Sequence, residues 1–348
     1  MQNITVAVDA MGGDFGPRVT VPAVVQALSH FPELKIILVG KQGDIFEHLS
    51  DFGYSSLSKL AEELGDRIEI VHCDQVISNS LKPSQALRKS AGSSMNTAIE
   101  WVASEKADAV VSSGNTGALM ALSRRHLNLL PGIERPALVS ALPTKTGNFT
   151  WMLDLGANVV SSEEALFQFS VMGSALAEQH LERQPRVALL NIGVEDIKGV
   201  ERVKRCAELL SQTQSVNYIG YIEANKLFDD IADVIVCDGF TGNSCLKASE
   251  GTAQFFIEKL TSSIMSPSIK GWIGRKLFSG LLKELKLLNP DQYNGASLLG
   301  LRGIVIKSHG SADVTAVVNA IGEAVHEVKR RVPSRIRDRL EAVLLERH

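Results

Sequence analysis

The chain has 348 residues, a formal net charge of −3 and an apolar fraction of 45%. These values predict a sizeable core in one large domain or in two closely joined lobes. The nearly neutral charge argues against general binding to nucleic acid. The four cysteines lie too far apart for a C-x-x-C pair, which favours buried thiols in a reducing compartment. No run of 18 or more apolar residues occurs, so we expect no membrane-spanning helix.

Short apolar runs and amphipathic stretches alternate from the start of the chain. The first predicted elements are, in order, a strand at 4–8, a helix at 17–30, a strand at 36–39, a polar helical stretch at 42–64, a strand at 68–72, a short helix opened by Pro83, and a helix through Met95 and Val102. The chain begins without the basic start and long apolar core of a signal peptide, so we expect a cytoplasmic protein.

The same alternation continues to the end of the chain. The later elements are, in order, a strand at 108–111, a helix at 116–127, a strand at 137–142, a strand leading to Asp154, a helix at 162–181, strands at 187–190, 216–222, 233–237 and 303–307, a core helix capped by Ser311, and a charged helix from Ser334. This pattern predicts an α/β fold over residues 1–348, with helices flanking a largely parallel sheet.

The segment from Asp108 to Met120 has the clearest functional pattern. Gly114 and Gly117 let a ligand approach the backbone closely, and the helix at 116–127 turns its free N–H groups toward the same loop. Asn115 and Thr116 add polar side chains there. The loop therefore predicts a site for a phosphate-sized anion, although an ordinary strand-to-helix turn has the same local sequence.

Four further strands end in Gly, Asn, Asp or His, within 152–158, 187–193, 234–243 and 304–311. Ligands bind outside the carboxyl ends of parallel strands, so we expect these endings to form one shared site. Two of the endings supply the amides of Asn158 and Asn243. Asp154 and Asp238 are harder to explain without a function, because a carboxylate is costly to bury without a purpose or a partner.

Candidate cations accompany these loops. Lys82-Pro-Ser84 places a lysine beside a helix start, which favours a phosphate, but a solvated surface lysine fits as well. Lys198 is also typical of a helix surface, and His309 of a structural hydrogen bond. The dinucleotide, Walker, H-E-x-x-H and G-x-S-x-G signatures are missing from the sequence, and no metal-ligand spacing occurs. We therefore expect no metal and no cofactor.

The stretch at 266–288 departs from the alternating pattern. As a helix it carries Trp272, Leu281 and other apolar residues on one face and lysines and arginines on both flanks. A basic amphipathic helix of this kind is typical of dimer packing or of reversible attachment to an anionic membrane surface. Both interpretations remain open at this point.

The chain contains six sequence motifs in a characteristic order: Asp9–Asp14, Lys82–Met95, Ser113–Ala118, Asp154–Asn158, Val236–Asn243, and Tyr293–Gly300 with Lys307–Gly310. In this order they resemble the PlsX family of phosphate acyltransferases, from residue 4 to about 330. The resemblance implies a fold like that of isopropylmalate dehydrogenase and phosphotransacetylase. It also implies an enzyme that converts acyl-[acyl-carrier-protein] and inorganic phosphate into acyl phosphate and free carrier protein.

The resemblance further implies a homodimer that works at the inner face of the bacterial membrane. There it would supply acyl phosphate to a membrane glycerol-3-phosphate acyltransferase in phospholipid synthesis. The acyl chain needs an apolar groove, for which the 255–288 region is a candidate. The acidic carrier protein needs a basic patch, such as residues 124–126 or the lysine-rich flank at 270–286.

This reaction requires positioning and charge stabilisation more than a protein nucleophile, because phosphate is itself nucleophilic and a thiolate leaves readily. We hypothesise that Asn115, Thr116 and the loop N–H groups hold phosphate, assisted by Lys82 and Ser84. Lys198 or His309 would stabilise the tetrahedral oxyanion, while Asp154 and Asp238 orient these groups.

Two alternatives remain at this stage. A metal- and NAD-dependent decarboxylating dehydrogenase would share the fold type, although the sequence lacks aspartates at ligand spacing. A non-catalytic scaffold could recruit lipid enzymes through the 266–288 helix, but it would not need five polar strand endings. NADH binding would reveal the first, and absence of thiol release from an acyl carrier would favour the second.

Overall fold

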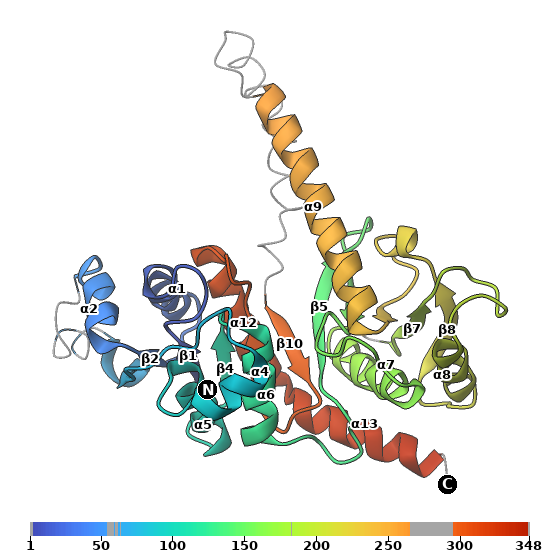
Figure 1. Cartoon of the computed structure of the whole chain (residues 1–348), viewed down its shortest axis with the longest axis horizontal. Coiled ribbons are helices and arrows are strands. Elements are labelled where there is room, and N and C mark those ends of the chain that lie inside the picture. Colours follow the sequence, from blue (N-terminus) through green and yellow to red (C-terminus); the bar gives the residue numbers. More distant parts are fainter. Residues whose placement is uncertain are drawn as a thin grey trace.

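The computed structural model describes residues 3–53, 59, 62, 64–181, 183–264 and 295–346. These residues form one 11-stranded sheet of order β3-β2-β1-β4-β11-β10-β5-β6-β9-β7-β8 with helices on both faces (Figure 1). The strands are β1 Ile4–Asp9, β2 Leu34–Gly40, β3 Ile68–His72, β4 Ala109–Ser112, β5 Ala137–Pro143, β6 Phe149–Leu153, β7 Arg186–Leu190, β8 Asn217–Ile222, β9 Val234–Val236, β10 Ala296–Leu299 and β11 Ile304–Lys307. The predicted α/β fold with a largely parallel sheet is confirmed.

Helices cover the sheet in three hydrophobic clusters. The helices are α1 Pro17–His30, α2 Gln42–Ser50, α4 Pro83–Lys89, α5 Ser94–Ala103, α6 Thr116–Leu127, α7 Glu163–Glu178, α8 Glu201–Ser211, α9 Gly239–Ile264, α12 Val314–Arg330 and α13 Val332–Glu346. In the half of the sheet that contains β1, α1 and α12 pack on one face and α5 and α6 on the other. Helices α7, α8 and α13 pack together in the half of the sheet that contains β7. The hydrophobic cluster beneath α5 and α6 continues across the central strands.

Strand direction reverses in the middle of the sheet. β1, β2, β3, β4 and β11 are mutually parallel, and so are β6, β7, β8 and β9. Between the two groups, β10 is antiparallel to both β11 and β5, and β5 is antiparallel to β6. These three reversals make the two groups run in opposite directions. The five predicted strand endings therefore come from both groups: those of β4 and β11 from one, and those of β6, β7 and β9 from the other.

Most element boundaries follow the local chemistry of the sequence. Pro17 opens α1, and the Asn115 side chain caps α6 by accepting a hydrogen bond from Ala118 N at 2.9 Å. The predicted Ser311 cap of the last core helix is wrong. Asp313 caps α12 instead, because its Oδ1 lies 2.8 Å from Ala316 N. β10 was not predicted as a strand.

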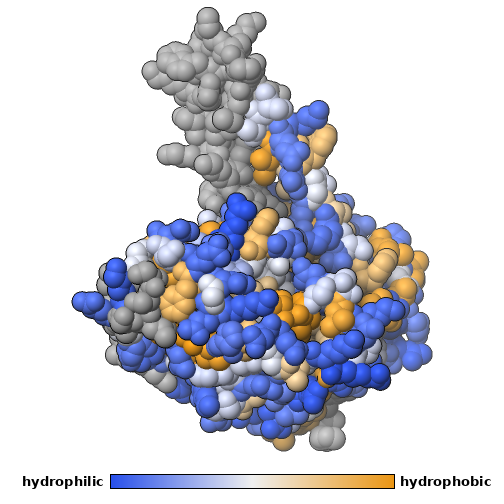
Figure 2. Space-filling model, turned by 60° about the vertical axis from the view of Figure 1, so that its left-hand side comes forward, coloured by the Kyte–Doolittle hydropathy of each residue, from blue (hydrophilic) through white to orange (hydrophobic). Residues whose placement is uncertain are grey.

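Helix α9 projects away from the sheet (Figure 1). Its 26 residues span roughly 39 Å at 1.5 Å per residue. Phe255, Phe256 and Leu260 on its outer part are exposed, and Figure 2 shows hydrophobic residues interspersed with hydrophilic ones on this projection. The amphipathic segment predicted at 266–288 lies outside the described residues. Within the described residues, no helix combines the length and apolar character needed to cross a bilayer.

Candidate active site

Three parallel neighbours, β1, β4 and β11, end beside one another in polar residues. Asp9, Ser112 and Lys307 occupy one row of the sheet, since Ser112 pairs with both Asp9 and Lys307. Ser112 Oγ donates to Asp9 Oδ2 at 2.7 Å and accepts from Gly114 N at 3.1 Å. The carboxyl ends of these strands thus connect a buried carboxyl group to the predicted anion loop.

The loops after these strands pack closely against one another. A Cβ on Gly12 would lie 2.7 Å from Gly114 N, and one on Gly114 would lie 2.5 Å from Met95 Cε. A Cβ on Gly13 would meet Gly310 O at 3.0 Å. These glycines therefore let the loops after β1, β4 and β11 pack against one another. The sequence had suggested only that Gly114 lets a ligand approach the backbone.

The starts of two helices lie next to this cluster. Lys82 is the N-cap residue of α4, Ser84 belongs to its first turn, and Thr116 opens α6. Asn115 Nδ2 donates to Leu81 O at 3.0 Å, and a Cβ on Gly117 would lie 2.7 Å from Pro83 Cγ. The structure therefore brings the predicted phosphate residues of both segments together, but it uses the Asn115 side chain as a cap and a loop tie.

His309 joins the same cluster from the loop after β11. Its Nε2 lies 3.0 Å from Lys247 Nζ, and its Nδ1 lies 2.8 Å from Ser311 Oγ. Ser311 N also donates to Nδ1 at 3.3 Å, so this loop holds the ring in place. Lys247 belongs to α9 and also pairs with Glu250 at 2.6 Å. Helix α9 thus brings a cation from the opposite half of the sheet to the ends of β4 and β11.

Lys307 is a buried cation of this cluster whose pKa is strongly lowered. Its Nζ donates to Ser113 O at 3.3 Å and to Ser308 O, and the side chain is buried. Burial lowers the pKa of Lys307 to about 8, assisted by Lys247, while Asp9 opposes the shift. Burial likewise raises the pKa of Asp9 above its usual value. A lysine poised near neutral pH at converging strand ends is typical of a functional site.

A second cluster of predicted residues surrounds Asp154, just after β6. The Asp154 carboxylate is 0% exposed and accepts hydrogen bonds from the backbone N–H groups of Leu138, Ala157 and Asn158 at 2.7 to 3.1 Å. The Asn158 side-chain amide also donates to it at 2.9 Å and to Pro136 O at 2.8 Å. Burial nevertheless raises the Asp154 pKa. Asp154 is therefore a buried acceptor that shapes the β6 loop.

Asp238 and Asn243 adjoin this second cluster at the start of α9. Asp238 accepts from Thr241 N at 2.9 Å and pairs with Arg202 of α8 at 2.5 Å. Burial opposes ionisation of Asp238, but these bonds lower its pKa. A Cβ on Gly156 would lie 3.5 Å from Asn243 Cβ, so the β6 loop touches α9.

Lys198 lies in the loop between β7 and α8, where its hydrogen bonds go to Glu195 and Asn191 of the same loop. Its Nζ pairs with Glu195 Oε1 at 2.9 Å, and this hydrogen bond raises the Lys198 pKa. Asn191 Nδ2 donates to Lys198 O at 3.1 Å and holds the loop in place. The structure thus leaves Lys198 exposed and brings only His309 to the anion loop.

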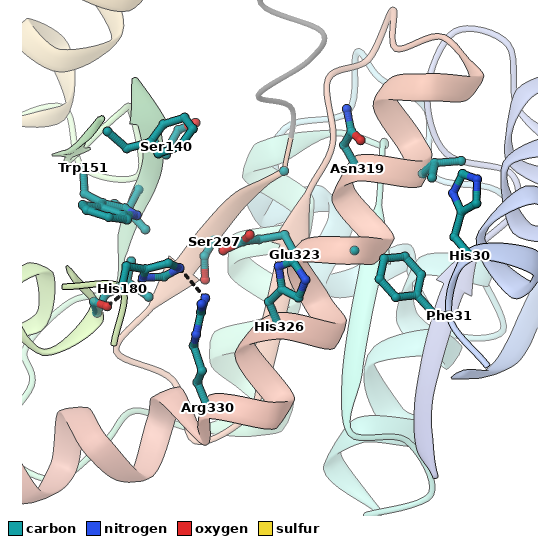
Figure 3. Close-up of a pocket in the computed structure, with 17 residues that line it drawn as sticks. His30, Phe31, Ser140, Trp151, His180, Ser297, Asn319, Glu323, His326 and Arg330 are labelled. Atoms are coloured by element: carbon teal, nitrogen blue, oxygen red, sulfur yellow. Dashed lines mark hydrogen bonds between the residues drawn. The ribbon is translucent and has the colours of Figure 1, made fainter. Parts of the chain in front are cut away.

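A pocket of about 460 Å³ lies between α12 and the strands β5, β6 and β10 (Figure 3). Trp151 and His180 line one side, with ring centroids 4.8 Å apart, and Glu323 and Arg330 of α12 line another. Arg330 hydrogen-bonds to His180. None of the predicted site residues lines this pocket, so it is distinct from the two clusters.

The first cluster has the chemistry of an oxyanion site. Lys247, Lys307 and His309 supply donors beside the start of α6, whose backbone N–H groups favour negative charge. Lys247 was not predicted from the sequence, although its spacing of four residues from Asn243 places both on one side of a helix. In the described ranges, no three His, Cys, Asp or Glu side chains are arranged to hold a metal ion.

Comparisons with known proteins agree with this chemistry. The family described as fatty acid synthesis protein matches residues 4–335. The phosphate acyltransferase of Vibrio campbellii is 72% identical over 348 residues, 100% of each chain, and that of Vibrio cholerae serotype O1 is 73% identical over the same span.

Solved structures share the fold at low sequence identity. A phosphotransacetylase from Streptococcus pyogenes superposes with a TM-score of 0.61 at 14% identity, covering 93% of this chain and 94% of its own. A 4-hydroxythreonine-4-phosphate dehydrogenase from Klebsiella pneumoniae gives 0.53 at 14% identity, covering 94% and 100%. With the full-length matches above, these findings show an acyltransferase that uses phosphate, and the chain belongs to the PlsX family of phosphate acyltransferases.

Proposed function

We propose that this enzyme transfers the acyl group of acyl-[acyl-carrier-protein] to inorganic phosphate, releasing acyl phosphate and free carrier protein. The observation that carries the proposal is the gathering of Lys247, Lys307 and His309 at the anion loop before α6. This site can bind and orient an anionic nucleophile without a protein nucleophile. It supplies what the phosphate half of the reaction needs.

In the proposed reaction, phosphate binds between the start of α6 and the two lysines. The free N–H groups at the start of α6 hold its oxygens, with Thr116 donating from the first turn. Gly114 shapes the loop, because its N–H group already donates to Ser112 Oγ. Lys82 and Ser84 assist from the start of α4, which lies beside α6. The Asn115 side chain acts by keeping this loop in place, because its amide is already bonded.

A phosphate oxygen then attacks the thioester carbonyl carbon. The new C–O bond yields a tetrahedral oxyanion, which His309 stabilises by donating a hydrogen bond after its contact with Lys247 rearranges. Lys247 supplies positive charge beside it. The C–S bond breaks as the carbonyl re-forms, and the carrier thiolate leaves and takes a proton from solvent. Preorganised donors of this kind contribute about 100- to 1,000-fold each in turnover.

The second cluster has an orienting role in this scheme. Asp154 shapes the β6 loop through its backbone hydrogen bonds, and Asn158 secures the carboxylate. Asp238 holds the start of α9 through Thr241 N, which places Asn243 toward the substrate. We retain Lys198 as the alternative oxyanion donor, which requires its loop to move from the Glu195 pairing.

We also propose the setting in which the enzyme acts. Residues 1–348 form one enzyme unit of two closely joined lobes, which pairs as a homodimer. It works in the cytoplasm at the inner face of the membrane and passes acyl phosphate to a membrane glycerol-3-phosphate acyltransferase. The acidic carrier protein docks on basic residues, for which Arg124 and Arg125 in the last turn of α6 are candidates.

The decisive experiment measures thiol release from palmitoyl-carrier protein with and without inorganic phosphate, while hydroxylamine traps acyl phosphate. Phosphate-dependent thiol release with an equal amount of hydroxamate is expected. Release without phosphate would indicate a thioesterase and refute the proposal. Absence of release with every acyl carrier protein tested would refute it as well. Charge reversal at Arg124 and Arg125 should raise the KM for the carrier substrate but not that for phosphate.

A further inference from the structure

Loops at the ends of β6 and β7 expose an unusual number of large apolar side chains. Together with the first turn of α9 they form what we name the loop patch, consisting of Val159, Val160, Ile192, Val194, Ile197 and Phe240. Ile197 is 84% exposed and Phe240 is 69% exposed. Single apolar residues at a surface need no explanation, but a group of this size is typical of a binding surface.

Contacts between the loops support treating these residues as one surface. Phe240 N donates to Val159 O at 3.2 Å, which joins the start of α9 to the β6 loop. Arg202, two residues after Val200, pairs with Asp238, which immediately precedes α9. The β7 loop is therefore tied to the same helix start, and β9 lies between β6 and β7 in the sheet.

One side of α9 connects the loop patch to the anion cluster, which is the first cluster with Lys247, Lys307 and His309. Phe240 and Lys247 are seven residues apart, so they lie on the same side of the helix about 10 Å from each other. Asn243 lies between them on that side. Lys247 contacts His309, so this side of α9 faces the anion site. An elongated substrate could therefore follow α9 from charged to apolar surroundings.

We propose that the loop patch binds the acyl chain of the substrate, with the thioester carbonyl near Lys247 and the chain running along α9 toward Phe240 and Ile197. This inference rests on the proposed function and assigns a subsite to it. It places the chain at the start of α9 and not on the outer part of the helix, where Phe255 and Phe256 are also exposed.

The position of the reacting group favours this end of the helix. The acyl carbonyl must meet phosphate at the anion cluster, and the loop patch lies within about 10 Å of Lys247 along α9. Phe256 is nine residues beyond Lys247, or roughly 13 Å in the direction away from the sheet. A chain laid toward the sheet also meets exposed apolar side chains of three segments, namely the loops after β6 and β7 and the first turn of α9.

The test compares Phe240→Ser with Ile197→Ser, the double variant, and Phe256→Ser as a matched control on the same helix. These side chains are largely exposed, so the variants should fold, which circular dichroism and thermal melting check. Steady-state kinetics use butyryl- and palmitoyl-carrier protein as acyl donors. We expect the palmitoyl KM to rise about tenfold in each single patch variant and about 100-fold in the double variant.

Three values should stay within about twofold of those of the unaltered protein: the palmitoyl KM of Phe256→Ser, and the butyryl KM and phosphate KM of the patch variants. None of them depends on burial of a long acyl chain in the loop patch. An unchanged palmitoyl KM in the double variant would overturn the inference, as would a rise confined to Phe256→Ser. A shift of the double variant from dimer to monomer in light scattering, with unchanged palmitoyl KM, would assign the loop patch to a second copy instead. Failure of the unaltered protein to transfer acyl groups would refute the proposed function separately.

Discussion

Glu327 on α12 provides a quantitative test of the electrostatics in this fold. It is 2% exposed, and in the described part of the chain its Oε1 has no hydrogen-bond partner. Glu323, one turn earlier, lines the pocket of Figure 3. Burial and the neighbouring Glu323 carboxylate raise the pKa of Glu327 from 4.5 to about 8. At neutral pH the folded protein therefore holds Glu327 protonated.

This shift makes stability depend on pH with a definite sign. Between pH 4.5 and 8, folded Glu327 keeps a proton that the unfolded chain has lost, so the unfolding free energy falls as pH rises. A shift from 4.5 to about 8, at about 1.36 kcal/mol per unit, corresponds to a loss of roughly 5 kcal/mol across that window. Glu327→Gln preserves the shape of the protonated acid and removes this titration.

The assay is urea unfolding of both proteins at pH 5, 6.5 and 8. At pH 5 the unfolding free energies of Glu327→Gln and the unaltered chain should agree within about 1 kcal/mol. At pH 8 the variant should be more stable by roughly 3 to 5 kcal/mol. Parallel pH profiles for the two proteins would refute the reasoning, because they would mean that Glu327 ionises normally in the folded state.

Three further predictions concern the site and the acid stability of the fold. Lys247→Met should lower kcat about 100- to 1,000-fold while Lys259→Met on the same helix leaves it unchanged, and equal kcat values for both would remove Lys247 from the site. Phosphate binding should raise the pKa of Lys307 from about 8, so the protein should take up a proton on binding at pH 8.5. Titration calorimetry in Tris and in borate, two buffers with different heats of ionisation, should therefore give different binding heats. Identical heats would contradict this prediction. Burial opposes ionisation of Asp233, but hydrogen bonds from Arg183 and Arg186 lower its pKa to about 2. The unfolding free energy should therefore fall by about 2 kcal/mol as pH decreases from 4 to 2, a loss that Asp233→Asn should abolish.

Local sequence chemistry predicted the individual elements well. Pro17 marked the start of α1, and the Gly-rich loop marked the start of α6, both with the observed bounds. Asp154 was singled out because a carboxylate is costly to bury without a purpose or a partner, and the structure shows it buried with backbone hydrogen-bond partners. Such predictions succeed because capping, periodicity and burial act over a few neighbouring residues.

Strand direction and distant contacts were beyond the reach of the sequence argument. β10 has only four residues, and nothing in Ala296–Leu299 indicates that it pairs antiparallel with both of its neighbours. Together with the antiparallel β5–β6 pair, this pairing makes the strands from β6 to β8 run opposite to β4 and β11. Lys247 reaches His309 across 62 positions of sequence, so locally it has the pattern of an ordinary surface lysine. Such features depend on tertiary packing and not on local propensity.

The length of α9 determines how a motion of its outer end would be transmitted to Lys247. The helix is anchored near Gly239, where a Cβ would lie 2.4 Å from Asn158 O, and it extends to Ile264. Lys247 lies about 12 Å from this anchor and the far end about 37 Å, so rotation of a rigid helix about Gly239 would displace Lys247 about one third as far as the end. A displacement of the end by about 3 Å would then move the ammonium about 1 Å, which is the scale of one hydrogen bond.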